Sequence, residues 1–189
     1  MRKIVLLIVC SVSLLLADAS ETYMGYKVMK MPFKISGNQY VELKLTEAGP
    51  IPVENEDYKI TNAGLFVAPS SENKTIPNLF FGFGLTKKSD ANVSEIIIEE
   101  VFPSEKAMTI YEEKDPQFSD KSWFSKRAHC VVPNEQNTPW LYNAKGSIFV
   151  YKFTIKKYDG SFSTLLQLVW FSRELKSSLL QSIAKYKDI

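Results

Sequence analysis

The sequence is poor in the residues from which most catalytic and metal centres are built. It contains one histidine and two cysteines among 189 residues. The histidine is His129, so a metal site made of several imidazoles within one subunit is excluded, as is any mechanism that needs two imidazoles. No phosphate-cradling glycine loop, nucleophile elbow or zinc-protease motif occurs either. We therefore expect a protein that is not an enzyme and holds no metal or cofactor.

A surplus of charge of one sign is also lacking. Lys and Arg total 23 and Asp and Glu total 21, with the two signs interspersed along the chain. A surface that binds nucleic acid needs a basic stripe, because much of the affinity comes from counterions released from phosphates. Nucleic acid is therefore not expected as a partner.

Long apolar runs are absent except at the amino terminus, where Arg2 and Lys3 precede an apolar stretch from Ile4 to Leu16. This stretch is shorter than the roughly 18 residues that a membrane-spanning helix needs. It is followed by the small-x-small triplet Ala17-Asp18-Ala19, which is typical of a signal-peptidase site. We predict a signal peptide that is cleaved before Ser20.

Cleavage would remove residues 1–19 and leave residues 20–189 as a single globular domain with no transmembrane segment. Cys10 offers a lipoprotein alternative, but Val9 stands where such a site needs a small residue. Cys130 would be the only cysteine of the mature chain, which therefore has no internal disulfide. A domain of this length does not depend on disulfides, so we expect a periplasmic or secreted protein.

The carboxyl-terminal part of the sequence carries the clearest fold signals. Phe149, Tyr151, Phe153 and Ile155 alternate with polar residues, which predicts a strand with one buried face. Asp159-Gly160 follows and favours a two-residue hairpin turn. Such a turn would fix the register of the second strand. The predicted pairs are Phe153 with Leu166, Tyr151 with Leu168, Phe149 with Trp170, Lys152 with Gln167, and Lys156 with Ser163.

A helix is predicted after this hairpin. Ser172 is a suitable N-cap, and apolar residues recur at helical spacing at Leu175, Leu179, Ile183 and Tyr186. The fold class that we predict is mainly β, an antiparallel two-sheet sandwich with this C-terminal amphipathic helix. The alternative is an α+β fold, in which helices cover one antiparallel sheet.

Earlier segments give weaker signals. Strands are expected at residues 41–45, 79–85 and 94–101, and residues 87–92 have the length of a long hairpin connection. Gly82 and Gly84 face away from the aromatic residues of their strand, where we expect close packing. Further along, the pattern suggests a short helix at residues 104–113 and a strand at residues 127–132.

Large aromatic residues are concentrated in the segment that follows, and four of them are candidate binding residues: Trp123, Phe124, Trp140 and Tyr142. Aromatic side chains on loops bury much area with few rotors, which suits a recognition surface. The alternative is that they belong to the core. If they bind, they should form one contiguous exposed patch.

The leading functional hypothesis is therefore an exported, non-catalytic binding or interaction module whose partner is a protein or an envelope component. Two alternatives stay open. A secreted enzyme would use His129 or Cys130 in a cleft beside a carboxylate. A copper-binding protein would bring thioethers of Met24, Met29 or Met31 to Cys130 or His129, since soft ligands select copper(I). Oligomeric state does not follow from the sequence.

Overall fold

The computed structural model describes residues 22–23, 26–36, 39–46, 49–50, 53–69, 76–90, 92–103, 106–119, 123–143 and 146–185. The predicted signal peptide, residues 1–19, lies outside these ranges. The strands are β1 (Thr22–Tyr23), β2 (Tyr26–Ser36), β3 (Gln39–Thr46), β4 (Gly49–Pro50), β5 (Val53–Glu54), β6 (Tyr58–Pro69), β7 (Pro77–Lys87), β8 (Val93–Phe102), β9 (Met108–Lys114), β10 (Trp123–Val131), β11 (Ser147–Lys157) and β12 (Phe162–Phe171). The helices are α1 (Pro139–Tyr142) and α2 (Arg173–Lys185).

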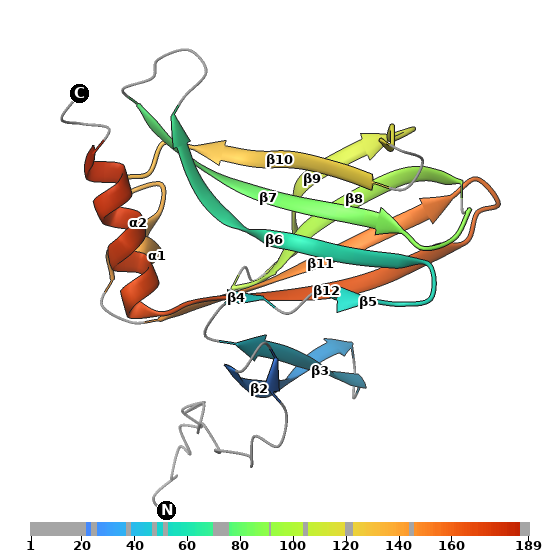
Figure 1. Ribbon diagram of the computed structural model, residues 1–189, viewed down its shortest axis with the longest axis horizontal. Coiled ribbons are helices and arrows are strands. Elements are labelled where there is room, and N and C mark those ends of the chain that lie inside the picture. Colours follow the sequence, from blue (N-terminus) through green and yellow to red (C-terminus); the bar gives the residue numbers. More distant parts are fainter. Residues whose placement is uncertain are drawn as a thin grey trace, which may run out of the picture.

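The described strands form two four-stranded antiparallel sheets that pack face to face, so the predicted sandwich with a C-terminal helix is confirmed (Figure 1). One sheet has the order β10-β7-β6-β5 and the other β12-β11-β8-β9. A smaller sheet, β1-β2-β3-β4, packs against the outer face of the second one. The connection at residues 87–92 joins β7 to β8 in the opposite sheet, so it is not the hairpin that its length suggested.

The core lies between the two sheets and is dominated by aromatic side chains. In β11 and β7 alternate residues face inward, because side chains of a strand point to opposite faces in turn. Phe153 and Ile155 of β11 and Leu85 of β7 are fully buried there, and the ring centroids of Phe83 and Phe153 lie 5.6 Å apart. Burying one such side chain stabilises a fold by about 1.5 to 3 kcal/mol, so this aromatic layer is the main source of stability.

The register of the β11–β12 hairpin differs by one residue from the prediction. Phe153 pairs with Leu165 and Tyr151 pairs with Gln167. The reason is the turn, in which the backbone N–H of Gly160 donates to the carbonyl of Lys157 at 3.1 Å. Gly160 has φ +84°, so the loop has three residues and ends in a glycine of left-handed conformation instead of having two residues.

The smaller sheet explains why the hydrophobic pattern did not reveal this register. Leu43 of β3 forms a buried cluster with Val150 and Leu168, which lie on the outer face of the second sheet. Both faces of β12 are therefore apolar around Leu168. A strand that is covered on both sides fits two registers equally well, because the pattern no longer distinguishes inside from outside.

Gly82, on the outer face of β7, is packed as expected. A Cβ atom at this position would lie 3.1 Å from Cδ2 of Phe66, because the ring of Phe66 covers the glycine backbone. The same ring stacks on Phe80, with centroids 5.8 Å apart. Aromatic coverage of this kind compensates for the side chain that the glycine lacks.

Two other predictions need correction or refinement. Residues 104–113 were expected to include a short helix, but β9 begins at Met108 and pairs with β8. Helix α2 begins as predicted, since Ser172 Oγ accepts a hydrogen bond from the backbone N–H of Leu175 at 3.1 Å. Its inward face was misassigned in part, because Leu175 is exposed whereas Lys176 is buried.

The two ends of the sandwich differ in what closes them. At one end, here called the α1 end, helices α1 and α2 stand across the strands (Figure 1). The other, here called the turn end, contains the connections β5–β6, β7–β8 and β11–β12. Within the described residues, no helix is long and apolar enough to cross a membrane.

Candidate functional site

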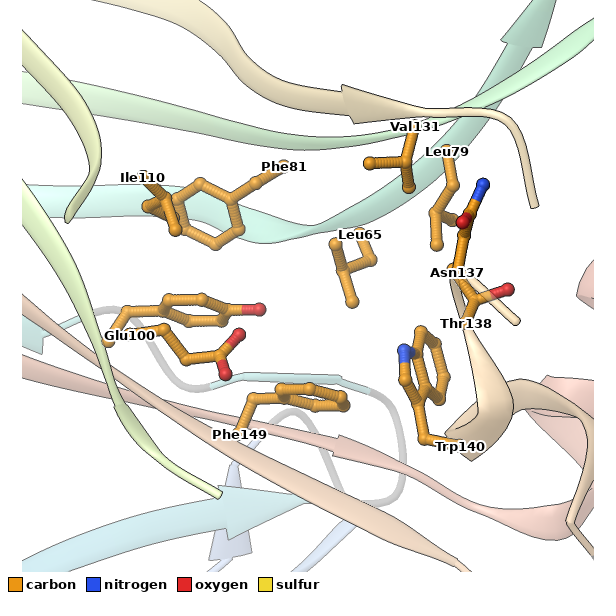
Figure 2. A pocket seen from close by; sticks show the side chains of 11 residues that line it. Leu65, Leu79, Phe81, Glu100, Ile110, Val131, Asn137, Thr138, Trp140 and Phe149 are labelled. Carbon is orange, nitrogen blue, oxygen red and sulfur yellow. The ribbon is translucent and has the colours of Figure 1, made fainter. Parts of the chain in front are cut away.

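A cavity of about 60 Å³ lies between the two sheets at the α1 end (Figure 2). Apolar side chains from both sheets form most of its wall, while its polar groups come from β8, β11 and the segment that leads into α1. The described residues that line it are Leu65, Leu79, Phe81, Glu100, Ile110, Val131, Asn137, Thr138, Trp140, Phe149 and Tyr151.

Three polar residues form a row across the inner face of the second sheet. Tyr151 of β11 pairs with Glu100 of β8 on one side and with Gln167 of β12 on the other. Gln167 is buried, and its Nε2 donates to the carbonyl of Leu168 at 3.0 Å. A carboxylate, a phenol and an amide thus lie side by side where the rest of the face is apolar.

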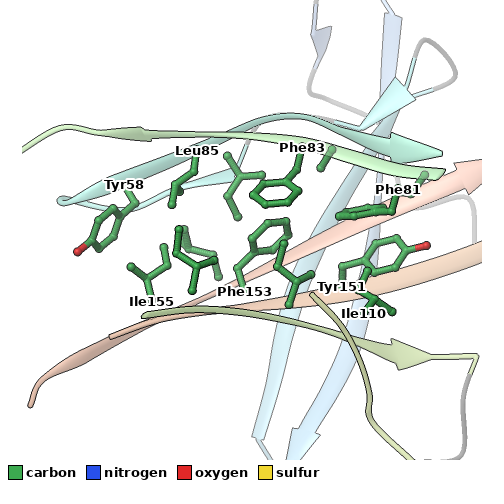
Figure 3. Packing of buried hydrophobic residues seen from close by; sticks show 14 of the residues in the cluster. Tyr58, Phe81, Phe83, Leu85, Ile110, Tyr151, Phe153 and Ile155 are labelled. Carbon is green, nitrogen blue, oxygen red and sulfur yellow. The ribbon is translucent and has the colours of Figure 1, made fainter. Parts of the chain in front are cut away.

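Tyr151 is the central member of this row. Its side chain is only 2% exposed, and its ring packs against Phe81 with centroids 4.2 Å apart. Its hydroxyl points out of the aromatic cluster (Figure 3) and has no hydrogen-bond partner among the described residues. Burial raises the pKa of this phenol far above its ordinary value, and the charge of Glu100 raises it further. The hydroxyl is therefore a neutral hydrogen-bonding group at the cavity wall.

Trp140 of α1 forms the side of the cavity that faces the helices. Its ring lies edge-on to Phe149 with centroids 4.9 Å apart, and 5.1 Å from the ring of Phe171. Figure 2 shows Trp140 and the carboxylate of Glu100 on opposite sides of the same space. Trp140 is half-buried, so it belongs both to the edge of the core and to the cavity.

The loop before α1 is fixed by its own hydrogen bonds. Asn134 Oδ1 accepts from the backbone N–H groups of Gln136 and Asn137 at 2.9 and 2.7 Å. The carbonyl of Asn134 accepts from both the backbone N–H and the hydroxyl of Thr138. Pro139 then begins the helix, a position at which its missing N–H costs nothing. This turn presents Asn137 and Thr138 to the cavity.

Lys176 of α2 holds α1 in place. Its ammonium donates to the carbonyl of Trp140 at 2.6 Å and to Asn143 Oδ1 at 2.8 Å, and it lies 5.9 Å from the centroid of the Trp140 ring. The side chain is buried, which lowers the pKa of this ammonium because desolvation disfavours the charged form. A buried cation thus positions the aromatic wall without lining the cavity.

The four predicted binding residues do not form one patch. Phe124 is only 2% exposed and packs against Phe83 and Phe118 in the core, so it is not available to a partner. Trp140 lines the cavity, and the adjacent Tyr142 is exposed and donates from its hydroxyl to the carbonyl of Pro133 at 3.4 Å. These two lie together at the α1 end.

Trp123 is separated from that pair by the length of β10. Its backbone pairs with Thr86 of β7 near the turn end, and β10 runs from there toward the α1 end (Figure 1). The side chain of Trp123 lies outside the described part of the structure. The backbone alone places Trp123 away from Trp140, so the two do not form the contiguous surface expected of them.

The residues of the two alternative hypotheses lie mainly outside the described side chains. His129 and Cys130 are in β10 where its register with β7 shifts between Ala128 and Val131, which marks a β-bulge in this edge strand. Their side chains, Met24 as a whole and the side chains of Met29 and Met31 are not described. Among the described residues, no group of three or more His, Cys, Asp or Glu side chains is arranged to hold a metal ion.

Sequence reasoning missed Glu100 as a site residue. Adjacent carboxylates at Glu99 and Glu100 suggested two solvated surface groups. A usable signal existed, because Glu100 is in phase with Ile96 and Ile98, both fully buried on the inner face of β8. A carboxylate at an inward position of a strand is a stronger indication of a site than two neighbouring carboxylates.

Comparison with protein-family models, with curated protein sequences and with solved structures found no match to this chain.

Proposed function

We propose that this chain is an exported, non-catalytic binding module of the periplasm or cell envelope, which holds a chemical group of its partner in the α1-end cavity. The partner is a protein or an envelope component. The observation that carries the proposal is the hydroxyl of Tyr151, which lines the cavity and has no hydrogen-bond partner among the described residues although the side chain is 98% buried, the complement of its 2% exposure. Buried polar groups are normally hydrogen-bonded, so such a group at a cavity indicates a missing ligand.

The chemistry of the cavity supports binding over catalysis. A phenol with a raised pKa remains protonated at neutral pH, so Tyr151 acts as a hydrogen-bonding group and not as a base or nucleophile. The wall is otherwise aromatic and aliphatic, which is typical of small-molecule sites with a few placed polar groups. Export is supported by the pattern of Arg2, Lys3 and the apolar run that ends before Ala17-Asp18-Ala19.

One measurement tests both parts of this proposal. The protein is produced with its own leader in a bacterium, purified from the periplasm, and examined by native mass spectrometry. We expect a chain that begins at Ser20 and carries a bound molecule. Leu65→Phe, which fills the cavity, should abolish the bound mass while the protein stays folded, since overpacking typically costs about 1 to 3 kcal/mol.

Tyr158→Phe is the matched control, because it removes an exposed hydroxyl at the turn end. It should leave the bound mass unchanged. A bound molecule that survives in Leu65→Phe would place binding elsewhere and contradict the site. An intact leader on the purified protein, or recovery from the cytoplasm alone, would contradict export.

A further inference from the structure

We infer that the α1-end cavity binds a small organic cation, specifically a methylated ammonium group. This inference names the ligand class of the proposed site and therefore rests on the proposed function. It is argued from three properties of the cavity: the rings that form its wall, the sign of its charge and its size.

Aromatic rings form the larger part of the wall. Phe81, Trp140, Phe149 and Tyr151 all line the cavity and come from three different elements, namely β7, α1 and β11. The face of an aromatic ring carries partial negative charge and attracts a cation that lies within about 6 Å of the ring centroid. Sites made of several such rings are a recurrent solution for methylated ammonium ions, which have few hydrogen-bond donors and are weakly hydrated.

The charge of the cavity has the sign that a cation needs. Glu100 is the only ionisable carboxylate or cation among the described lining residues, and its carboxylate is directed toward the cavity in Figure 2. The oxygen of the Tyr151 hydroxyl adds lone pairs beside it. An anionic ligand would instead meet a like charge in a site of low dielectric, where repulsion is strong.

Lys176 is the one described cation close to this wall, and its geometry keeps it out of the cavity. Its ammonium is bound by the carbonyl of Trp140 and by Asn143, and the residue does not line the space. Its attraction to the ring of Trp140 also shows that this ring accepts a cation. Lys176 therefore supports α1 and does not replace the ligand.

The size of the cavity matches one methylated ammonium head group. A water-sized group needs about 10 to 15 Å³ of such a cavity. The measured volume of about 60 Å³ thus accommodates about four groups of this size, which corresponds to a nitrogen and three methyl groups. A longer tail would have to leave past Asn137 and Thr138, the polar lining residues next to α1.

The test compares two ligands of the same shape and different charge. Choline and its neutral carbon isostere, in which a tert-butyl group replaces the trimethylammonium group, are titrated into the whole mature protein and followed by NMR and by isothermal calorimetry. We expect choline to bind at least about tenfold more tightly, with shifts concentrated on residues of the cavity. Equal affinity of the two compounds would overturn the inference, and this comparison needs no variant.

Charge at Glu100 should account for the preference. Glu100→Gln should reduce the preference for choline about tenfold while leaving the affinity for the neutral isostere nearly unchanged. Glu99→Gln is the matched control, since Glu99 is the preceding residue on the same strand and pairs with Lys152 on the outer face at 2.5 Å. An unchanged preference in Glu100→Gln, or an equal loss in Glu99→Gln, would also overturn the inference.

A third titration distinguishes the source of the group. A short-chain phosphatidylcholine below its micelle concentration should bind more tightly than choline if the ligand is a lipid head group, and more weakly if it is a free solute. If neither choline nor the lipid binds, the inference is wrong. The proposed function then stands if the periplasmic protein still carries a bound mass that Leu65→Phe removes, and it fails with the inference if no bound mass is found.

Discussion

The two ends of the sandwich are built on different principles. At the α1 end, aromatic packing and two helices enclose a cavity into which polar groups project. At the turn end, short hydrogen bonds between side chains and backbone fasten loops to one another. The comparison indicates that the turn end holds the sheets in position, whereas the α1 end combines packing with space for a ligand.

The turn end is organised around Asp57 in the β5–β6 connection. Its carboxylate accepts from the ammonium of Lys157 at 2.7 Å and from the hydroxyl of Ser89 at 3.0 Å. Asn55 Oδ1 accepts from the backbone N–H groups of Asp57 and Tyr58 at 3.0 and 2.8 Å, which closes the loop on itself. One carboxylate thus links three connections that are far apart in sequence.

A second hollow at the turn end shows the same contrast. Its volume is about 450 Å³, but it is open to solvent and lined largely by polar residues of loops. Tyr158 donates from its hydroxyl to Asp115 there, and the ammonium of Lys87 lies 4.9 Å from the centroid of the Phe118 ring. The hydroxyl of Tyr58 is also buried without a partner among the described residues, but Tyr58 does not line this hollow. An unpartnered phenol and a cavity coincide at the α1 end.

The largest expected effect comes from the aromatic packing of the α1 end. Phe149→Ala should lower the free energy of unfolding by about 3 to 5 kcal/mol, because the buried ring contacts Trp140, Tyr151 and Phe171. Phe162→Ala, at a strand end next to the β11–β12 turn, should change it by less than about 0.5 kcal/mol, since that side chain is 68% exposed. Chemical denaturation measures both. Similar losses for the two variants would remove the distinction between the ends.

An intermediate effect is expected at the β11–β12 turn. Gly160 has φ +84°, and no atom lies within 4 Å of a Cβ added there, so substitution introduces backbone strain without a clash. Gly160→Val should destabilise the fold by about 1 to 2 kcal/mol, and Gly160→Asn by less, because asparagine tolerates the left-handed region. Equal melting temperatures for wild type and the valine variant would contradict the three-residue loop.

The smallest effect concerns the ion pair at the turn end. The hydrogen bond from Lys157, followed by that from Ser89, lowers the pKa of Asp57 below its ordinary value of 3.8. The unfolded chain therefore takes up a proton before the folded one, so the contribution of Asp57 to stability is present above about pH 4 and is lost as pH falls through the lower folded pKa.

Asp57→Asn should accordingly flatten the fall in melting temperature below about pH 4 while changing it little at neutral pH, where exposed ion pairs contribute little. Lys157→Met should flatten the same limb, and combining the two should add nothing further. A double variant whose effect equals the sum of the two single effects would indicate that Asp57 and Lys157 act independently.

Comparing the two ends also shows which parts of the fold could be predicted from sequence. Strand β11, the positive φ of Gly160 and the Ser172 cap depend on local chemistry, and all three are confirmed. The register of β12 failed because Leu43 covers its outer face from a distant part of the chain. A pattern within one strand carries no information about what lies on its far side.

The candidate site was predictable only in part. Trp140 and Tyr142 were selected as aromatic residues in loops, and they lie at the α1 end. Glu100 and Tyr151 were not selected because their significance depends on three strands being adjacent, with Tyr151 between Glu100 and Gln167. Phe124 was selected for the same reason as Trp140, yet strand pairing opposite Leu85 places it in the core.

The position of α2 in chain order has a consequence for how the protein acquires its site. This helix follows every described strand and contacts β6, one of the earlier elements, so the α1 end closes through contacts between distant segments. Contacts of this kind form late and slowly in folding. As the chain emerges from a ribosome or a translocation channel, the sheets can pair while the cavity remains an open mouth. The interior is sealed when α2 arrives and Lys176 binds the carbonyl of Trp140.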